Sequence, residues 1–511
     1  MLTLLQQEVL LAEVEALRDE NARLRRCLHA RRSERFVEAG AEQLNLFTEV
    51  DEHVEVDPPA PGEPVGTPTL TRRPGRNPLP AHFPLEIEMV TPGGEGPNGE
   101  GGQPVIEGPI APDDLDAVVQ RDGYDLLGYE TSERVVYRPG QYVRVLQRRP
   151  RYRCRKTGKI VVAHARDRVL ARSVADETLG ADVVVRKFLD HQPLYRQARA
   201  LRRDHAWALS PATMGKWVER IAVTLRPLYR ALLAQVTAAE YVQMDESTIR
   251  VMSADKPGAT HQGWMWLVRD PGSGAVAFQY DRGRASAVPR ALLDSFAGVI
   301  QTDGYGAYAK ALKALRAGGA EITHVGCLAH VRRKFHEAKD ADPRAREALR
   351  LIAEIYRLEA QWRGHAPAAR QRERDKLLRP AFAAFDKWLR AHEQAAIPKT
   401  ALGKALGYAR SQWPTLAAVL EDGRLEVDNN GIEREVRPLA LGRKNYLFAG
   451  NHGAAENIAV LYSLLLTCKA QGVNPRAWLV DTLQRILTHP INRITELLPS
   501  NYKARTQDGV G

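Results

Sequence analysis

The chain of 511 residues is long enough for about three to four domains, and 44% hydrophobic residues suffice for at least one large core. Four cysteines in this length exclude a disulfide framework and point to a reducing interior. No apolar run reaches the roughly 18 to 20 residues that span a bilayer, and Glu8, Glu13 and Glu15 interrupt the apolar N-terminus. We therefore expect a soluble, cytoplasmic, multidomain protein, and the net charge of +11 hints only weakly at nucleic acid.

The positive charge is concentrated in one segment. Residues 1–131 carry a net charge of −14, whereas residues 132–172 alone carry +11. A dense basic run of this kind suits phosphate neutralisation with release of counterions, and the alternative is a solvated edge strand. The run consists of Arg144, Arg148, Arg149, Arg151, Arg153, Arg155, Lys156 and Lys159.

Residues 1–32 are predicted to form a helix that pairs with a second copy. Glu13 and Glu20 each stand five residues before an arginine, a spacing that gives ion pairs between parallel helices. Asn21 at a core position favours a coiled coil of two helices. The alternative is an amphipathic helix packed on its own chain. The heptad core positions are Leu10, Leu17 and Leu24, with Val14, Asn21 and Leu28 four residues after each.

Three further segments precede the central part of the chain. Pro and Gly make up 24 of the 55 residues from Pro58 to Pro112, so residues 33–118 are predicted to be an acidic linker. Alternation of Val, Tyr and Arg predicts a small basic β unit over 119–172. Residues 173–236 are predicted to be a helix-turn-helix, because Ser210-Pro211 is a strong helix start after a first short helix, although any helical hairpin has this pattern.

Residues 237–445 are predicted to be a mixed α/β domain in which two strands end in a carboxylate. Acids at strand ends converge more readily than acids on surface loops, so we expect Asp245 and Asp303 to lie close together. The alternative is that both are ordinary turn residues. The predicted elements are strands at 241–245, 264–269 and 275–280, a helix at 289–296, and strands at 299–303 and 322–325.

Two neighbouring carboxylates repel each other unless a cation lies between them, and oxygen ligands favour Mg²⁺. Two such ions about 3.5–4 Å apart can activate a water and stabilise the leaving oxygen of a phosphodiester. A third acid is found where Asp428 can cap a helix that starts near Asn429, because Asn430, Glu433 and Arg437 share one face of that helix. Glu433 is therefore the best third ligand. The basic side chains available there for phosphates are Arg437, Arg443 and Lys444.

Several blocks of the sequence match one known family over nearly the whole chain. They are MDEST around Asp245, QTDGYGAY around Asp303, GCLAHVRRKF at 326–335, DNNGIEREVRPLALGRKNYLFAG at 428–450 and HPINRITELLP at 489–499. Earlier matches are SERF with EQLNLF at 33–47, HQPLYRQ at 191–197 and LSPATMGKWV at 209–218. In these blocks the chain resembles the DDE transposases of the insertion-sequence-66 family, and the block at 428–450 is highly specific.

The resemblance implies a multidomain α/β protein with a ribonuclease-H-like catalytic core, a helical insertion at about 338–425 and a C-terminal helical region at 446–511. The coiled-coil helix, the β unit and the helix-turn-helix precede that core. Asp245, Asp303 and Glu433 are implied to be the catalytic triad that holds two Mg²⁺ ions, for which Mn²⁺ can substitute. The implied reaction cleaves DNA at the element's end and joins the freed 3′-hydroxyl to target DNA.

The implied partners are the terminal inverted repeats, target DNA, further copies of the chain in a homodimer or higher oligomer, and small companion proteins of the same element. The implied location is the bacterial cytoplasm, in association with the nucleoid. Two rival interpretations are a DNA-binding regulator with an inactive core and a nuclease that cuts without joining. The expected DNA contacts are Arg148, Arg149, Arg151, Arg153, Arg202, Arg203, Thr213, Lys216, Arg332, Arg333, Lys334, Asn430, Arg437, Arg443 and Lys444.

The cysteine pattern departs from that of the family. Members usually carry two CxxC pairs before the helix-turn-helix, whereas only Cys154 stands in that region here. One thiol cannot build a four-ligand zinc site, so no zinc is predicted there. Cys327 and His330 form a CxxH that the family shares, but two further ligands are lacking. We expect His330 to have a structural or DNA-contacting role together with Arg332, Arg333 and Lys334.

Overall fold

The computed structural model describes residues 79, 83–91, 105–110, 124–138, 140–253, 256, 258–394 and 396–502. The chain divides into a unit of residues 1–63 and a unit of residues 64–511, and all described residues belong to the second. The coiled coil predicted for residues 1–32 therefore lies outside the described residues. Within the described part of the chain, no helix combines the length and the apolar character needed to cross a membrane.

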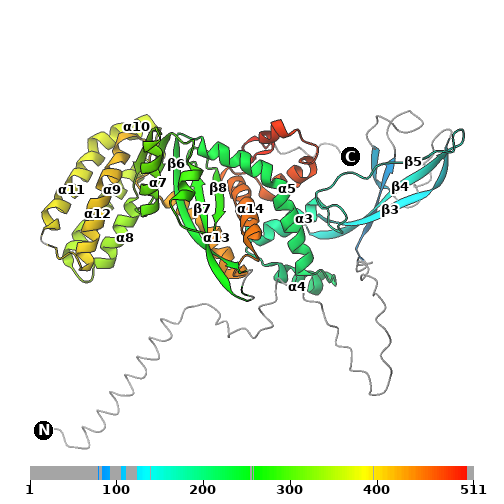
Figure 1. The fold of residues 1–511 in the computed structure, drawn as a ribbon, viewed down its shortest axis with the longest axis horizontal. Coiled ribbons are helices and arrows are strands. Elements are labelled where there is room, and N and C mark those ends of the chain that lie inside the picture. The colour runs from blue at the N-terminus through cyan, green and yellow to red at the C-terminus, as the bar shows by residue number, and fades with distance from the viewer. Residues whose placement is uncertain are drawn as a thin grey trace, which may run out of the picture. The chain divides into compact units, whose positions relative to one another are not determined.

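The first sheet forms the basic β unit (Figure 1). Its strands have the order β2-β1-β4-β3, and β5 pairs with β4 beyond this path. Strands β1 and β4 run parallel, and the other pairs are antiparallel. The strands are β1 (Leu85–Thr91), β2 (Val105–Ile110), β3 (Tyr124–Arg138), β4 (Gln141–Cys154) and β5 (Ile160–Val162).

Two of these strands lie within residues 33–118, where composition predicted a linker. The prediction averaged over a Pro- and Gly-rich stretch and missed the short alternating segment LEIEMVT. Ile87 and Met89 of that segment point to one face and are buried against Tyr129 and Leu146. The β unit therefore begins near Leu85 and not at residue 119.

Three helices follow the β unit. They are α3 (Glu177–Phe188), α4 (Leu194–His205) and α5 (Pro211–Thr237). The predicted start of the last helix is confirmed, because the Ser210 side chain accepts a hydrogen bond of 3.1 Å from the Thr213 backbone N–H. Helix α5 spans 27 residues, so it is much longer than a helix-turn-helix requires, and its later turns pack against β7, β8 and α14.

The central sheet has the order β10-β9-β6-β7-β8. Strands β6, β7 and β8 form an antiparallel meander, whereas β9 runs parallel to β6 and β10 runs parallel to β9. Each predicted strand of this region is present, and α6 (Ala287–Leu292) and α7 (Gly306–Ala317) come before and after β9. The strands are β6 (Tyr241–Met252), β7 (Thr260–Arg269), β8 (Val276–Asp281), β9 (Gly298–Gln301) and β10 (Ile322–Val325).

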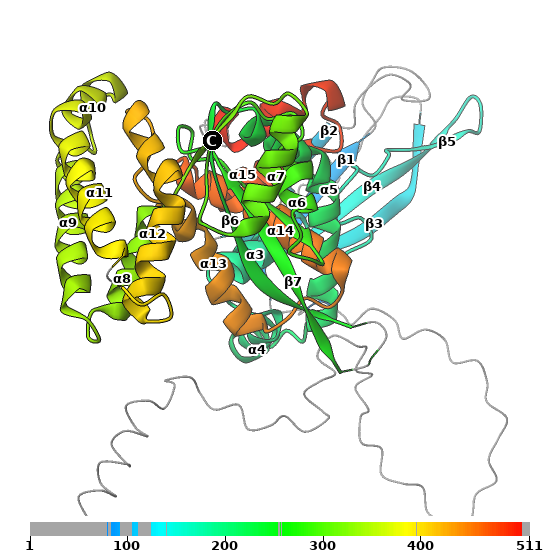
Figure 2. The same cartoon turned by 60° about the vertical axis from the view of Figure 1, so that its left-hand side comes forward.

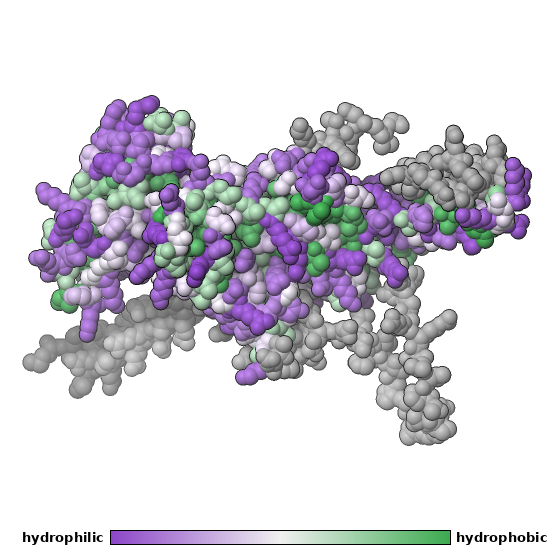
Figure 3. Space-filling view, turned by 45° about the horizontal axis from the view of Figure 1, so that its top comes forward, coloured by the Kyte–Doolittle hydropathy of each residue, from purple (hydrophilic) through white to green (hydrophobic). Residues whose placement is uncertain are grey.

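A helical insertion with its own hydrophobic core follows β10 (Figure 2). Figure 3 shows hydrophilic side chains over much of its outer surface, as expected for amphipathic helices around one core. Its first helix begins at Leu328, ten residues before the predicted start of the insertion at 338. The helices are α8 (Leu328–Ala338), α9 (Pro343–Gln361), α10 (Pro367–Glu373), a π-helical turn (Arg374–Leu378), α11 (Arg379–Glu393) and α12 (Ala401–Ala417), then a 3₁₀ turn (Ala418–Glu421).

The last helices belong to the core of the central sheet. Helix α13 (Asn430–Tyr446) is followed by α14 (His452–Ala470), α15 (Pro475–Arg485) and 3₁₀ turns at 491–497 and 499–501. The hydroxyls of Ser463 and Thr467 accept hydrogen bonds of 2.7 Å and 3.1 Å from backbone N–H groups of β8. Residues from 446 onward thus share one core with the sheet, and the boundary predicted at 445/446 does not separate two bodies.

Candidate active site

The two predicted aspartates stand at the same level of neighbouring parallel strands. Pairing between β6 and β9 ends at Gln243 and Gln301, and each aspartate comes two residues after that pair. Asp245 does not end its strand as predicted, because β6 continues to Met252 along β7. It lies instead where β6 passes the end of β9, and this register brings Asp245 and Asp303 to one edge.

The first turn of α13 carries the third acid, Glu433. Asn429 occupies the N-cap position, and the carboxylate of Asp428 accepts a 2.9 Å hydrogen bond from the backbone N–H of Asn430, the first residue of the helix. The buried Asn429 side chain donates a 2.9 Å hydrogen bond to the Met244 carbonyl. The Asn429 backbone N–H points to Cys327 Sγ at 3.2 Å. These two contacts hold the start of α13 directly beside the strand residue that precedes Asp245.

His330 on α8 lies between two of the acids. Its Nε2 is 3.9 Å from Asp303 Oδ2, and its Nδ1 is 4.0 Å from Glu433 Oε1. On the same helix, Arg333 places Nη2 4.0 Å from Glu433 Oε1. The CxxH motif thus brings an imidazole into this site, a position that the sequence alone did not indicate.

Asp245 lies in a buried position within the electrostatic field of the neighbouring carboxylates. Burial, followed by the charges of Glu246, Asp303 and Glu433, raises the pKa of Asp245 to about 8. Among the described residues, no group of three His, Cys, Asp or Glu side chains is arranged closely enough to hold a metal ion. The donor set nevertheless fits a hard divalent cation, because three converging carboxylates repel one another and offer only oxygen ligands.

Beside Asp245, Glu246 anchors a cation and a phenol. Its carboxylate, whose side chain is 2% exposed, accepts hydrogen bonds from Arg284 and from the hydroxyl of Tyr308. The Arg284 guanidinium lies 3.6 Å from the ring centroid of Tyr305, and the Tyr305 backbone N–H donates to Asp303 at 2.9 Å. This arrangement fixes the loop that carries Asp303.

The helical insertion also reaches the site. Tyr408 on α12 lies against Gly304, where an added Cβ would come within 2.5 Å of the tyrosine oxygen. Burial, together with the charge of Asp303, raises the pKa of Tyr408 to about 12, so the phenol stays protonated at neutral pH. No signal in the sequence connected Tyr408 with Asp303, because about a hundred residues separate them.

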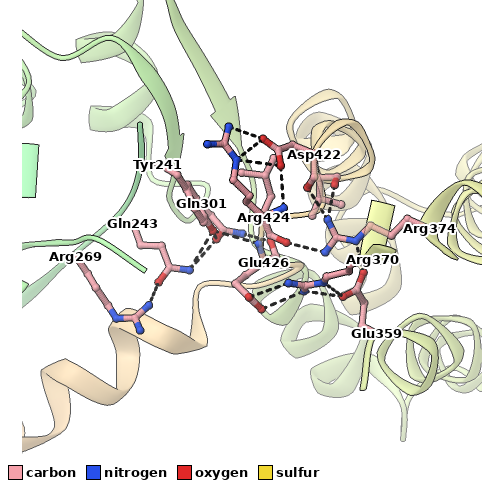
Figure 4. Close-up of polar contacts among 12 residues, drawn as sticks. Tyr241, Gln243, Arg269, Gln301, Glu359, Arg370, Arg374, Asp422, Arg424 and Glu426 are labelled. Atoms are coloured by element: carbon pink, nitrogen blue, oxygen red, sulfur yellow. Dashed lines mark hydrogen bonds and ion pairs between the residues drawn. The ribbon is translucent and has the colours of Figure 1, made fainter. Parts of the chain in front are cut away.

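A buried polar chain includes Gln243 and Gln301, the strand residues two positions before each aspartate (Figure 4). Arg269 donates to Gln243, and Gln243 donates to Gln301, with distances of 2.9 Å for both. Gln301 in turn donates a 2.6 Å hydrogen bond to the backbone carbonyl of Glu426, which lies in the segment that leads to α13. Tyr241 joins the same chain through the Gln301 side chain. The chain thus connects the strands of both aspartates to the segment that leads to Glu433.

The predicted DNA contacts on β4 have different surroundings. Arg149 Nη2 donates to Glu130 at 2.7 Å, so much of its charge is balanced. The Arg148 guanidinium lies 5.5 Å from the ring centroid of Tyr129. The other two predicted contacts on this strand are exposed, Arg151 and Arg153.

The predicted contacts on α4 and α5 are mostly on the surface. Arg202 and Lys216 are exposed, and Arg203 forms an ion pair of 2.6 Å with the adjacent Asp204. Thr213 lies in the first turn of α5, where its hydroxyl is 2.9 Å from that of Ser210. These side chains are accessible, whereas Trp217 on α5 is buried in the core.

The remaining predicted DNA contacts lie on α8 and α13, and some are exposed whereas others are paired within the protein. Arg332 is exposed, Lys334 pairs with Glu337 on its own helix, and Asn430 donates to Asp428 at 2.6 Å. Arg443 holds α13 to β6 through Ser247 and Thr248, so it has a structural role in addition to any contact with DNA. The other two predicted contacts on α13, Arg437 and Lys444, are exposed.

Comparisons with known proteins cover most of the chain. The model described as the IS66 transposase family matches residues 172–457, the IS66 C-terminal element matches 463–500, and a model described as "Transposase C of IS166 homeodomain" matches 16–87. The uncharacterized protein y4jD of Sinorhizobium fredii is 36% identical over 70% of this chain and 72% of its own length. The uncharacterized protein y4qI of the same organism is 34% identical over 74% and 72%.

The homeodomain match at 16–87 lies upstream of the helix-turn-helix predicted at 173–236, and most of it falls outside the described residues. The transposase match spans α3 to α13, and so includes Asp245, Asp303 and Glu433. The C-terminal match covers the last two turns of α14, all of α15 and most of the turns that follow. Together these matches show that the chain belongs to the insertion-sequence-66 transposase family, a family of DNA-processing enzymes that act in transposition.

Proposed function

We propose that this transposase binds the ends of its mobile element and catalyses metal-dependent strand cleavage and strand transfer. The observation that carries the proposal is the convergence of Asp245, Asp303 and Glu433 from two adjacent strands and one helix. A meander of three antiparallel strands extended by two parallel strands supports a ribonuclease-H-like core, with the insertion placed between the second and third acids.

Asp245, Asp303 and Glu433 are the residues that would hold the metal ions. When bound there, two Mg²⁺ ions, or Mn²⁺ in their place, supply Lewis-acid polarisation of a phosphodiester and activation of a water or hydroxyl. Hydrolysis at the element's end leaves a 3′-hydroxyl, and this hydroxyl then displaces the 3′-oxygen of a target phosphodiester, so the number of phosphodiester bonds is conserved in the second step. No bond between the enzyme and DNA is needed.

The protein's own residues would orient the DNA around this chemistry. Arg333 lies beside Glu433, and Arg437 and Lys444 are exposed on the same helix as Glu433, so each can meet a phosphate of the bound DNA. The Tyr305 N–H holds Asp303, and the Asn429 side chain holds the start of α13. These contacts keep the carboxylates in place before DNA binds.

Two element ends must be brought together, so we infer that the enzyme acts as a dimer or higher oligomer through residues 1–32. The helix-turn-helix and the basic β unit would read and grip the terminal repeats. Small companion proteins of the element would join this assembly.

The test incubates the purified full chain with a labelled DNA end taken from the repeats that flank its own coding sequence, in Mg²⁺ and in Ca²⁺. Nicking at the end and joining to a target plasmid are expected with Mg²⁺, whereas binding alone is expected with Ca²⁺. Cutting without joining would favour the nuclease interpretation. Binding without cutting in Mg²⁺ would favour the regulator and overturn the proposal.

A further inference from the structure

Two hollows lie beside α5 and share one wall. The larger has a volume of about 960 Å³ and the smaller about 590 Å³, and residues 169 and 171–174 line both. The walls come from β3, β4, the segment after β5 and the first half of α5. We call the two hollows together the basic groove. The basic side chains that line it are Arg149, Arg166, Arg168, Arg172, Lys216 and Arg220.

Several cations of the basic groove are held by neutral partners. Arg220 Nε donates to the Val169 carbonyl at 3.2 Å, and Arg166 Nη2 donates to the Gln484 carbonyl at 3.2 Å. A carbonyl fixes the direction of a guanidinium but leaves its charge uncancelled, unlike the carboxylates that face most arginines of β3 and β4.

Acidic side chains are fewer along the same walls. They are Glu133, Asp167 and Glu219, and Glu133 is already paired with Arg144 at 2.9 Å. Arg166, Lys216 and Arg220 are all exposed, so a ligand can reach them. A concave surface with an excess of one charge concentrates the field and attracts the opposite charge.

We propose that the basic groove holds the phosphodiester backbone of DNA, at a position separate from the three catalytic carboxylates. The groove joins the two regions for which the sequence predicted DNA contact, because Arg149 lies on one wall and Thr213 and Lys216 lie on the other. It adds Arg166 and Arg220, which no sequence pattern singled out. Phosphate contacts of this kind position a duplex and carry no sequence information themselves.

The inference rests on the proposed function only for the identity of the ligand, which is DNA. The salt dependence of DNA binding tests directly whether the basic groove contacts phosphates. In a plot of the logarithm of the DNA affinity against the logarithm of the salt concentration, each phosphate contact contributes about one to the slope. Near 0.1 M salt, each contact also raises the affinity about tenfold. Arg220→Gln and Arg166→Gln should each weaken binding of the labelled element end about tenfold and reduce the slope by about one. Lys216→Gln should have the same effect. Because Lys216 is exposed and the substitution breaks none of the carbonyl hydrogen bonds made by Arg166 and Arg220, this variant is expected to fold like wild type.

Lys313→Gln is the matched control, because it removes one exposed charge from α7, away from the groove walls. Binding is measured in Ca²⁺ on the full chain, so cleavage does not enter the result. If wild type binds and the groove variants keep the affinity and slope of Lys313→Gln, the groove inference is overturned while the proposed function stands. If wild type binds no DNA at any salt concentration, the proposed function itself fails.

Discussion

Replacing Asp303 with asparagine is expected to lower both strand cleavage and strand transfer about a thousandfold. The substitution keeps the size of the side chain and its hydrogen bond with the Tyr305 N–H but removes the negative charge that a metal ligand supplies. Losing one carboxylate of the set costs several kcal/mol of transition-state stabilisation, and about 4 kcal/mol corresponds to a factor of a thousand. The rates are measured with a pre-nicked and an intact labelled end, which separate joining from cutting.

Asp294→Asn is the matched control for this substitution. Asp294 is exposed in the segment between α6 and β9, so its loss should leave both rates unchanged. Affinity for DNA in Ca²⁺ should be similar in both variants and in wild type. Activity of Asp303→Asn within a few-fold of wild type would mean that the convergence of carboxylates has no catalytic role.

Replacing Arg374 with methionine is expected to lower the free energy of unfolding by about 3–5 kcal/mol. Arg374 is fully buried, donates to Glu359 at 2.6 Å and also donates to three backbone carbonyls of the segment 419–425. Methionine fills the space but leaves the Glu359 carboxylate with Arg370 alone and leaves the carbonyls without their donor. Urea unfolding monitored by tryptophan fluorescence gives the change, since Trp362, Trp388 and Trp413 lie in the insertion.

An exposed pair on the same insertion provides the comparison. Arg390 lies 2.9 Å from Asp386 on α11 and is exposed, so Arg390→Met should cost no more than about 1 kcal/mol. Equal losses for the two variants would contradict the view that the network around Arg374 holds the insertion together. Because Glu426 connects that network to Gln301, loosening it should also slow strand cleavage without changing DNA affinity.

Much of the central sheet could be predicted from the sequence, because hydrophobic strands and turn residues are local signals. The turn at Asp270–Gly274 and the cap at Ser210 are of this kind. The convergence of Asp245 and Asp303 was expected from strand ends, yet the actual cause is the register of β6 against β9, and register is not visible in one sequence. The strand β1 escaped prediction because composition averages over a window wider than seven residues.

Contacts between distant segments account for what the sequence did not reveal. Tyr408 reaches Gly304 only because the insertion folds back onto the second acid's loop. The buried links of Gln301 with Gly326 and Glu426 are equally long-range. The basic run was interpreted as suited to phosphate neutralisation, with a solvated edge strand as the alternative. The neighbouring strand β3 supplies Glu130 to Arg149 and Glu133 to Arg144, and this pairing follows only from the sheet.

The claim that Asp245, Asp303 and Glu433 hold the metal ions is tested most directly by measuring Mn²⁺ binding with electron paramagnetic resonance. The full chain is bound to its DNA end, and wild type is compared with Glu433→Gln and Glu435→Gln. Both residues lie in the first half of α13, but only Glu433 faces His330, whereas Glu435 lies near Arg269. Wild type and Glu435→Gln are expected to bind two ions, and Glu433→Gln is expected to lose at least one of them. Equal binding by all three proteins would show that Glu433 is no metal ligand and would contradict the proposed metal site.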